Sequence, residues 1–182
     1  TINADSVSLG TLAAGTGTVT IQNMTAGTLI TVGGPTTSDV RTTTPKTLVI
    51  HSTELSKITA ATTVIGRNDA TGSGNVTVST VNMGALGNTA GNLTVLGGND
   101  IAVSGAITKT AGTDATLTLN AVNGIDVTAA VGATTAGVGK LNVAMTANGN
   151  ATVATSSKGI TFTQAINANG GTVNLTGINK NT

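Results

Sequence analysis

The stretch Asn92-Leu-Thr-Val95, followed by Asp100-Ile-Ala-Val-Ser-Gly-Ala-Ile107, recurs in altered form 24 residues later. The second copy reads Thr116-Leu-Thr-Leu119 and then Gly124-Ile-Asp-Val-Thr-Ala-Ala-Val131. One period relates all the apolar positions of the two copies, in the pairs Leu93 and Leu117, Ile101 and Ile125, Val103 and Val127, and Ile107 and Val131. A fixed period of roughly 20 to 50 residues is typical of repeat architectures, whose units bury their apolar faces only by stacking on one another.

The composition favours short strands over helices. Of the 182 residues 38% are hydrophobic and 8% are charged, and Phe162 is the single aromatic residue. Because an aromatic side chain normally brings about 150–250 Å² of buried surface to a core, its rarity predicts a narrow core of Val, Ile, Leu and Ala. The abundance of Thr and Val favours strands, and the 25 glycines suit tight turns.

The 24-residue step predicts an all-β fold, a parallel β-helix with coils of about 24 residues. In such a solenoid each residue lies over the residue one coil later, so Leu93 is expected to stack on Leu117 and then on Leu141. Backbone hydrogen bonds then join coils spaced by about 4.8 Å, and Thr, Ser and Asn form polar ladders on the outer face. An antiparallel sandwich also contains short strands and glycine-rich turns, but nothing in that fold requires a 24-residue register.

The chain is expected to form one β-helical repeat domain over residues 1–182. Its expected parts are early coils at 1–34, a lateral loop at 35–46, irregular coils at 47–91, regular coils at 92–147, an inserted loop at 148–158 and a closing coil at 159–182. Alternation of apolar and polar residues predicts strands at 6–9, 17–21, 28–32, 47–50, 62–65 and 171–175, and 75–86 resembles a shortened copy of 92–107. A short helical turn is expected at 52–59, where Leu55 and Ile58 are three residues apart and Ser52 or Thr53 can cap.

A third, degenerate copy begins at Lys140-Leu-Asn-Val143, where the period places Leu141 one step after Leu117. Leu117 and Ile125 lie eight positions apart, whereas Leu141 and Ile160 lie 19 apart, so about 11 residues are expected to be inserted near 148–158. Since loops on a rigid scaffold usually carry function, any binding is expected at the loops 35–46 and 148–158.

Several classes of partner are disfavoured by charge and composition. The net charge of +1, without a basic cluster, gives no electrostatic reason to expect nucleic acid or an anionic membrane. The absence of Cys rules out disulfides and thiolate metal sites. No apolar run approaches the roughly 18 residues of a membrane span, so no membrane insertion is expected. The chain opens on Thr1 without the regions of a signal peptide, so we expect either a removed signal or a piece of a longer protein.

Seven acidic residues are the candidates for catalysis: Asp5, Asp39, Glu54, Asp69, Asp100, Asp114 and Asp126. A β-helix can hold the paired carboxylates that glycoside-cleaving enzymes use. The 24-residue period sets Asp100 against Gly124 and Asp126 against Ala102, so no two acids share a column. We therefore predict that the chain is not an enzyme and has no catalytic residue and no cofactor.

His51, the single histidine, lies three residues before Glu54 in the only imidazole–carboxylate pair close in sequence. At a strand end leading into a helical turn, His51 is expected to be a solvated loop residue rather than a base or a ligand. A lone histidine predicts no metal site, and Asp100 and Asp114 belong to no repeating calcium motif.

Two further motifs carry little weight. Five Asn-x-Thr sequons, at Asn23, Asn75, Asn92, Asn150 and Asn174, are expected by chance in a chain so rich in Asn and Thr. Thr-x-Thr steps are typical of ice-binding solenoids and need to recur at one coil position. At the 24-residue period, Thr116 and Thr118 correspond to Asn92 and Thr94, and then to Lys140 and Asn142, which breaks a flat threonine array.

Several stretches resemble a known family. Ile107-Thr-Lys-Thr-Ala-Gly-Thr-Asp-Ala-Thr-Leu-Thr-Leu-Asn120, then Gly124-Ile-Asp-Val-Thr-Ala-Ala130 and Gly139-Lys-Leu-Asn-Val143, closely resemble the repetitive region of large filamentous haemagglutinin-like exoproteins of Gram-negative bacteria. Ser52-Thr-Glu-Leu-Ser-Lys-Ile-Thr-Ala60 with Thr63-Val-Ile-Gly66 resembles another recurrent element of those proteins. The resemblance covers nearly the whole chain. It implies a right-handed parallel β-helix, secreted by a two-partner or autotransporter-type route and displayed at the cell surface.

The function implied by this resemblance is that of a structural and adhesive shaft segment, which mediates cell attachment or surface assembly. The expected partner is a host or bacterial surface glycan or protein, or other copies of the chain. The alternative is a subunit of a self-assembling extracellular fibre, because uncapped strand edges template the addition of further strands.

Overall fold

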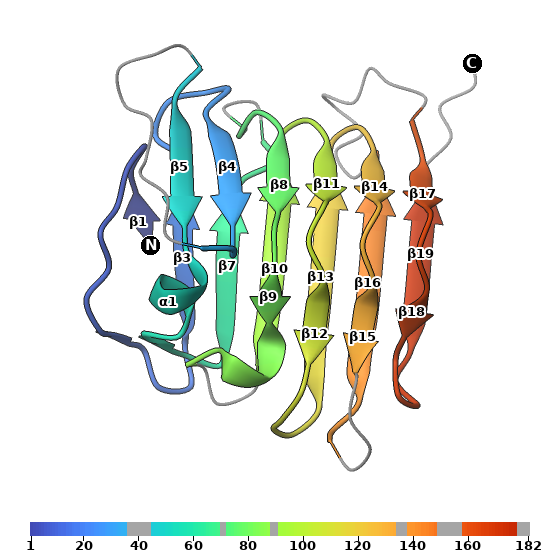
Figure 1. Cartoon of the computed structure of the whole chain (residues 1–182). Coiled ribbons are helices and arrows are strands. Elements are labelled where there is room, and N and C mark those ends of the chain that lie inside the picture. Colours follow the sequence, from blue (N-terminus) through green and yellow to red (C-terminus); the bar gives the residue numbers. More distant parts are fainter. Residues whose placement is uncertain (36–44, 70–71, 88–90, 134–137, 149–157, 178–182) are drawn as a thin grey trace.

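The computed structural model describes residues 1–35, 45–69, 72–87, 91–133, 138–148 and 158–177. These residues form a stack of parallel strands around a hydrophobic core (Figure 1). The strands are β1 (Ile2–Asn3), β2 (Leu12–Ala13), β3 (Thr18–Gln22), β4 (Leu29–Val32), β5 (Thr47–Ile50), β6 (Ile58–Thr59), β7 (Thr62–Gly66), β8 (Val76–Val78), β9 (Val81–Asn82), β10 (Asn92–Gly97), β11 (Ile101–Val103), β12 (Ile107–Lys109), β13 (Ala115–Ala121), β14 (Ile125–Val127), β15 (Val131–Ala133), β16 (Leu141–Ala147), β17 (Ile160–Phe162), β18 (Ile166–Asn167) and β19 (Val173–Gly177). Helix in this part of the chain consists of α1 (Ser52–Leu55) and the single 3₁₀ turn η1 (Met83–Ala85). The predicted all-β class with parallel sheets is confirmed.

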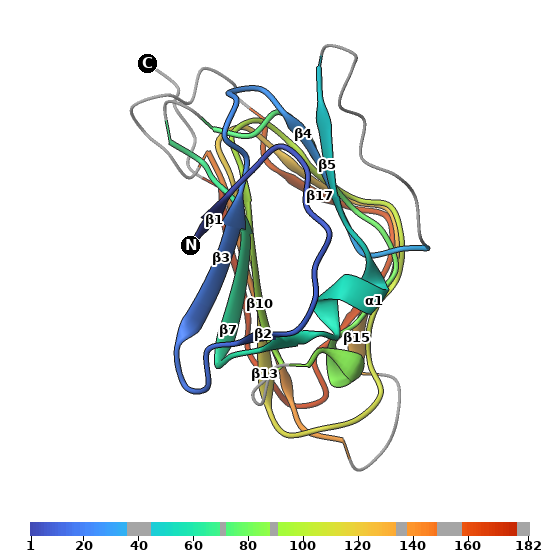
Figure 2. The same ribbon diagram turned by 90° about the vertical axis from the view of Figure 1, so that its left-hand side faces the viewer.

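The strands form four parallel sheets. The long sheet has the order β1-β3-β7-β10-β13-β16-β19, the middle sheet β17-β14-β11-β8-β4-β5, and the short sheet β18-β15-β12-β9, while β2 and β6 pair alone. Figure 2 looks along the stack from its N-terminal end and shows the long sheet on one side, with the middle and short sheets opposite. The chain therefore passes through the sheets in turn and encloses a narrow interior.

The register of the central strands matches the sequence period. Leu93 pairs with Leu117 in the long sheet, Ile101 with Ile125 in the middle sheet, and Ile107 with Val131 in the short sheet. Each of these pairs joins residues 24 apart. The predicted stacking of the two copies in 92–131 is confirmed.

The predicted register of the third copy is wrong. Leu141 pairs with Ala115, and Leu117 pairs with Val143, 26 residues later. The reason lies in two corners of the coil. Five residues join β12 to β13 but seven join β15 to β16, and three join β13 to β14 but twelve join β16 to β17. The added length is therefore divided, with two residues at one corner and nine at the corner containing 148–158, of which residues 149–157 lie outside the described part.

Three other predictions need correction. Residues 6–9 form no strand, because they cross the end of the stack rather than join a sheet. The helix ends at Leu55, and Ile58–Thr59 is instead β6, which pairs with β2. The shortened copy aligns differently, since Val76 pairs with Ile101 and Thr63 with Leu93, so it begins at β7 rather than at Asn75.

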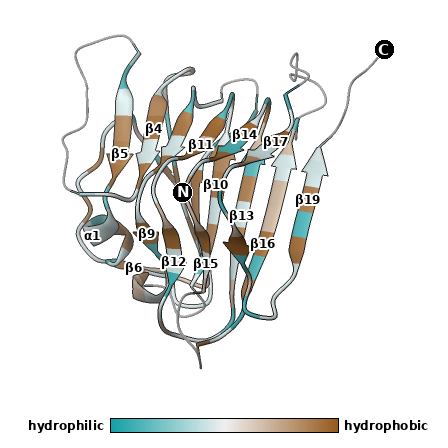
Figure 3. Ribbon diagram, turned by 45° about the vertical axis from the view of Figure 1, so that its right-hand side comes forward, coloured by the Kyte–Doolittle hydropathy of each residue, from teal (hydrophilic) through white to brown (hydrophobic). Residues whose placement is uncertain are grey.

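Aliphatic side chains form continuous columns through the interior. The longest column in the long sheet consists of Ile2, Ile21, Ile65, Val95, Leu119, Met145 and Leu175, each paired with the next. Its five inner members are at most 1% exposed. Figure 3 shows the hydrophobic bands repeating from strand to strand. Each coil thereby covers apolar surface that its neighbour would otherwise expose to water.

The chain leaves the regular winding near its N-terminal end. β4 lies between β8 and β5, so after β4 the chain returns outward to form β5, continues through α1 and β6, and only then enters β7 beside β3. Ile21 consequently pairs with Ile65, and Ile30 with Val76. The 24-residue period is lost here because this excursion, rather than a coil, separates the paired strands.

Candidate functional site

The N-terminal end of the stack is covered by its own chain. The segment between β1 and β2 runs across the opening of the core (Figure 2) and buries Leu9. The Leu9 amide donates to Glu54 Oε1 at 2.9 Å, and Lys57 Nζ donates to the Leu9 carbonyl at 3.0 Å. The residues around α1 therefore hold the crossing segment through both backbone polar groups of Leu9.

His51 and Glu54 belong to this cover, and the prediction of a solvated loop residue for His51 is wrong. Their side chains are 13% and 10% exposed. The His51 amide donates to Glu54 Oε2 at 3.1 Å, and the ring Nδ1 lies 3.2 Å from the Pro35 carbonyl. Sequence reasoning missed this because Leu9, the partner of Glu54, lies 45 positions earlier.

Asp5 is the second fastening of the covered end. Its carboxylate accepts hydrogen bonds from the amides of Met24 and Thr25, at 2.9 and 2.8 Å, from the Thr25 hydroxyl at 2.5 Å, and from Lys46 Nζ at 3.0 Å. Burial by itself raises the pKa of this carboxyl, but the bonds from Thr25, Lys46 and Met24 outweigh burial and hold the pKa well below its usual range. Asp5 is therefore ionised wherever the fold persists near neutral pH.

A groove lies on the outer face of the middle sheet and is the candidate binding site. This lateral groove has a volume of about 500 Å³. Its lining residues come from β8, β11, β14, β17 and the corners before them: Asn75, Val76, Thr77, Asp100, Ile101, Ala102, Gly124, Ile125, Asp126, Lys158, Gly159 and Thr161. The short side chain of Ala102 leaves room beside Asp126 in the neighbouring strand. Gly124 has no side chain, and Lys158 packs in the space that one would fill.

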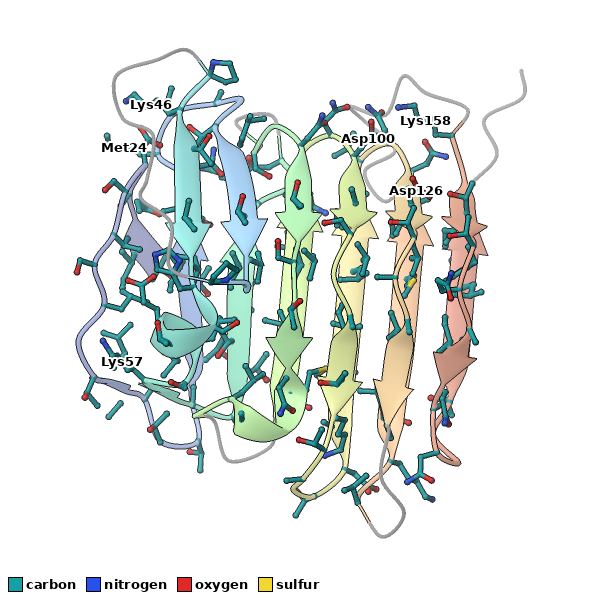
Figure 4. The ribbon with its side chains drawn as sticks, viewed as in Figure 1. Met24, Lys46, Lys57, Asp100, Asp126 and Lys158 are labelled. Carbon is teal, nitrogen blue, oxygen red and sulfur yellow. The ribbon has the colours of Figure 1, made fainter. Side chains whose placement is uncertain are left out.

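Two polar pairs border the lateral groove. Asp100 Oδ2 lies 2.6 Å from Lys158 Nζ, and Asp100 Oδ1 accepts from the Gly124 amide at 3.0 Å. The Thr161 hydroxyl donates to Asp126 Oδ1 at 2.6 Å. Figure 4 shows Asp100, Asp126 and Lys158 near the same end of the middle-sheet strands. Two carboxylates and one ammonium leave the groove with a net negative charge, which suits hydroxyl and cationic groups of a ligand.

The prediction that Asp100 and Asp126 do not share a column is confirmed, because Asp126 pairs with Ala102 and Asp100 bonds to Gly124. They nevertheless line one groove. The match of residues 160–166 to 125–131 in the sequence already placed Thr161 opposite Asp126, and the structure confirms that pairing. Lys158 was missed as the partner of Asp100, because it lies 58 positions later within the insertion.

The other acids are placed elsewhere. Asp69 forms a bidentate pair with Arg67, and Asp114 accepts from the Lys140 amide at 2.8 Å. Asp39 and the predicted lateral loop lie outside the described residues, apart from 35, 45 and 46. Within the described ranges no three His, Cys, Asp or Glu side chains lie close enough to hold a metal ion.

An asparagine ladder runs along the corner between the long and middle sheets. Asn99 Nδ2 donates to Asn75 Oδ1 at 2.6 Å, and Asn123 Nδ2 bonds to Asn99 Oδ1. Polar ladders were expected on the outer face, and this one is placed at a corner instead. The 24-residue steps from Asn75 to Asn99 and Asn123 are visible in the sequence and were the available signal.

Lys109 is a buried charged residue that sequence reasoning did not single out. Its side chain is 1% exposed, and Nζ donates to the Ala111 carbonyl at 2.8 Å. Burial lowers the pKa of the Lys109 amine, and the charge of Asp114 acts in the opposite direction. The alternation in β12 places Lys109 inward like Ile107, which was the signal for its burial.

The threonine pairs do not form a flat array in this register. Thr116 and Thr118 face Asn92 and Thr94 on one side, as expected, but Asn142 and Ala144 on the other. The threonine array is therefore interrupted, as expected, but on one side by Asn142 and Ala144 instead of the predicted Lys140 and Asn142. Asn150 of the five sequons lies outside the described residues. In the part of the chain that the structure describes, no helix is long and apolar enough to cross a membrane.

Comparisons with known proteins add no relative. The chain matches no protein-family model, and no curated protein or solved structure is significantly similar to it. The resemblance to filamentous haemagglutinin-like exoproteins therefore stays a prediction from the residues quoted above.

Proposed function

We propose that this chain is a structural and adhesive shaft segment of a secreted bacterial surface protein. In this proposal the shaft is a right-handed β-helix with coils of about 24 residues, displayed outside the cell. The handedness and the location come from the resemblance to filamentous haemagglutinin-like exoproteins. The coil length is supported by the pairs Leu93 with Leu117 and Ile101 with Ile125.

The observation that carries the proposal is the unbroken stacking of the long sheet. Seven strands follow one another from β1 to β19, and the column from Ile2 to Leu175 runs through all of them. Six strand spacings of about 4.8 Å give a length of about 29 Å. Because each coil contacts only its neighbours, such a stack acts as a rigid spacer whose length grows with the number of coils.

The use of the polar side chains supports a structural role. Four side chains each accept a hydrogen bond from a backbone amide of the next coil. Asp100 accepts from Gly124 and Asp114 from Lys140, and likewise Asn92 accepts from Thr116 and Asn142 from Thr172. A typical intramolecular hydrogen bond contributes about 0.5–1.5 kcal/mol to stability. Asp100 and Asp114 thus join coils through backbone amides, Asp126 does so through the Thr161 hydroxyl, and Asp5 and Glu54 fasten the covered end.

The adhesive role is assigned to the lateral groove, with a surface glycan or protein as partner. Asp126 and Asp100 offer acceptors for hydroxyl or amino groups, while Thr161 and Asn75 offer both donors and acceptors. Lys158, at the rim, belongs to the inserted corner and is its first residue described after 148. The groove therefore adjoins the interruption of the repeat, where binding was expected.

Adhesion is tested with beads carrying the purified chain, applied to cultured epithelial cells and to Gram-negative bacterial cells. Coated beads should bind more than albumin-coated beads to at least one of these surfaces. The double variant Asp126→Ala/Thr161→Ala should lower binding severalfold, whereas Thr94→Ala/Thr118→Ala, on the outer face of the long sheet, should not. Binding no greater than that of albumin contradicts the adhesive role. Binding that resists the groove variant contradicts only the assignment to the groove.

The fibre alternative receives less support. A head-to-tail fibre needs two open ends, and the segment containing Leu9 covers the N-terminal one. The shaft is therefore preferred. Electron micrographs of the concentrated chain should be free of filaments, and regular filaments would reverse this preference.

A further inference from the structure

The lateral groove contains one carboxylate that has no cationic partner among the described residues. Asp126 is exposed in the middle of β14, and its Oδ1 accepts the 2.6 Å hydrogen bond from the Thr161 hydroxyl. The other carboxylate of the groove, Asp100, is paired with Lys158 Nζ at 2.6 Å. Residues 149–157, which precede Lys158 in the sequence, contain no charged residue. The groove therefore keeps one uncompensated negative charge, at Asp126.

Hydroxyl and amide groups surround this charge. Thr77, Ala102, Asp126 and Thr161 are paired in succession across β8, β11, β14 and β17, on the outer face of the middle sheet. The short Ala102 side chain leaves a gap between the Thr77 hydroxyl and the Asp126 carboxylate, and Asn75 adds a side-chain amide to the lining. Because hydroxyl and amide groups both donate and accept hydrogen bonds, this row suits a ligand with many hydroxyl groups.

The groove lacks an aromatic surface on which a neutral sugar could stack. Phe162 is the single aromatic residue of the chain, and it packs against the hydrophobic core, on the opposite face of β17 from Thr161. A neutral glycan is therefore left with hydrogen bonds, for which water competes. A ligand with an ammonium group gains in addition a charge-assisted hydrogen bond to Asp126. The groove thus favours a cationic glycan over a neutral one.

A cationic peptide fits the groove less well than a cationic glycan. The described strands β8, β11 and β14 are each paired on both sides within the middle sheet. An extended peptide commonly binds a sheet by forming backbone hydrogen bonds with an unpaired edge strand. These three strands offer only side chains to a ligand, and the hydroxyl and amino groups of a sugar can bond to side chains alone.

We propose that the lateral groove binds a glycan that carries free amino groups, as in polymers of hexosamine without N-acetyl groups. The ammonium group of one sugar lies beside the Asp126 carboxylate and compensates its charge. Hydroxyl groups of the same sugar and its neighbour bond to Thr77, Thr161 and Asn75. This inference rests on the proposed adhesive role of the groove and names the chemistry of its partner.

The test compares two tetrasaccharides that differ only in the charge on their nitrogen atoms. The tetramer of glucosamine carries an ammonium group on each sugar at about pH 6, whereas the tetramer of N-acetylglucosamine is neutral. In nitrogen–proton correlation spectra of the full chain, the glucosamine tetramer should shift the amide signals of Ala102 and Asp126 until they saturate. Its dissociation constant should be at least about fivefold below that of the neutral tetramer, and added salt should reduce this difference because exposed charges are screened.

Two variants of the same kind assign the contact. Asp126→Asn keeps an oxygen that accepts from the Thr161 hydroxyl but removes the charge, so the two tetramers should bind this variant alike. Asp114→Asn is the matched control, since Asp114 accepts from the Lys140 amide at a corner outside the groove, and it should leave the preference for the glucosamine tetramer unchanged. Circular dichroism of each variant checks that the fold is retained.

Equal binding of the two tetramers, binding of neither, or a preference that survives Asp126→Asn would each overturn the inference. Tetralysine that shifts the same amides at a lower concentration would also overturn it, because the partner would then be a cationic peptide. The bead assay fails separately. Beads that bind cells through the groove, when the glucosamine tetramer does not bind, leave the adhesive role and remove only this ligand. Binding of the tetramer, when coated beads bind no better than albumin-coated beads, keeps this ligand and removes the adhesive role.

Discussion

The first and last described coils of this stack are of the same kind but differ in what covers their apolar side chains. At the N-terminal end, Asp5, Glu54 and Lys57 fasten a crossing segment whose Leu9 closes the core. In the last described coil the same aliphatic column reaches Leu175, which is 48% exposed among the described residues. The difference shows that stacking alone does not close a solenoid. Closure takes residues that lie outside the repeat and carry charge.

The covered end also explains the irregular part of the sequence. The excursion through β5, α1 and β6 places Glu54 and Lys57 beside Leu9, which a regular coil would not do. The excursion also breaks the 24-residue register, so that Ile21 pairs with Ile65, 44 positions later. The irregular segment β5–α1–β6 therefore helps to shield the first coil from water.

The largest expected effect compares the middle of a column with its open end. Leu119→Ala should lower the free energy of unfolding by about 3–5 kcal/mol, because the side chain is fully buried between Val95 and Met145 and its removal leaves a cavity. Leu175→Ala, the same change at the open end, should cost less than about 1.5 kcal/mol. Urea unfolding of both variants measures the contrast. Equal losses would mean that the C-terminal end is covered in solution.

The next effect is at Asp5. Asp5→Asn keeps the shape of the side chain but removes the charge that accepts bonds from Thr25, Met24 and Lys46, and should cost about 2 kcal/mol at pH 7. The control is Asp126→Asn, an exposed carboxylate with one hydroxyl partner, which should cost under about 1 kcal/mol. Urea unfolding at pH 7 measures both.

The same carboxyl predicts acid sensitivity. Because the pKa of Asp5 is lowered in the folded state, its stabilisation is fully present above the unfolded-state pKa of about 3.9 and is lost as pH falls below it. Unfolding free energies measured between about pH 6 and pH 2 should fall more steeply for the natural chain than for Asp5→Asn. Parallel curves would show that Asp5 is not the group responsible.

A smaller effect is expected at the helix that holds the cover. Glu54→Gln should cost about 1 kcal/mol, because the Leu9 and His51 amides donate to different oxygens of Glu54. The glutamine oxygen replaces one of these acceptors, whereas its NH₂ group only donates and leaves the other amide without its partner. Amide exchange should quicken in residues 6–13 and stay unchanged in β13. Exchange that quickens along the whole stack would contradict a local fastening.

The smallest effect is expected at the rim of the groove. Lys158→Ala should change the unfolding free energy by about 0.5 kcal/mol or less, because the lysine side chain is 61% exposed and its pair with Asp100 is screened by solvent. Thermal unfolding in low and high salt measures this change. A loss as large as that of Asp5→Asn would assign the pair to the closure of the C-terminal coils.

Much of the fold was predictable where one strand follows another at constant spacing. In 92–131 each apolar residue is inward and its partner is 24 positions away, so periodicity alone gave the pairs. The prediction failed where corners vary in length, because a corner can gain two residues between β15 and β16 without disturbing either strand. In the lateral groove the acids were identified, and the match of 160–166 to 125–131 placed Thr161 opposite Asp126. Lys158 was not identified, since its partner Asp100 lies 58 positions earlier, across the insertion.

The sequence by itself determined the class of fold, because alternation fixes which side of a strand is buried and a constant period fixes what stacks on it. Only the tertiary structure decided how the first coil is covered. Glu54 and Leu9 meet across 45 positions, and nothing periodic relates them. The physical reason is that interior contacts repeat with the coil, whereas closure depends on single hydrogen bonds between segments brought together once.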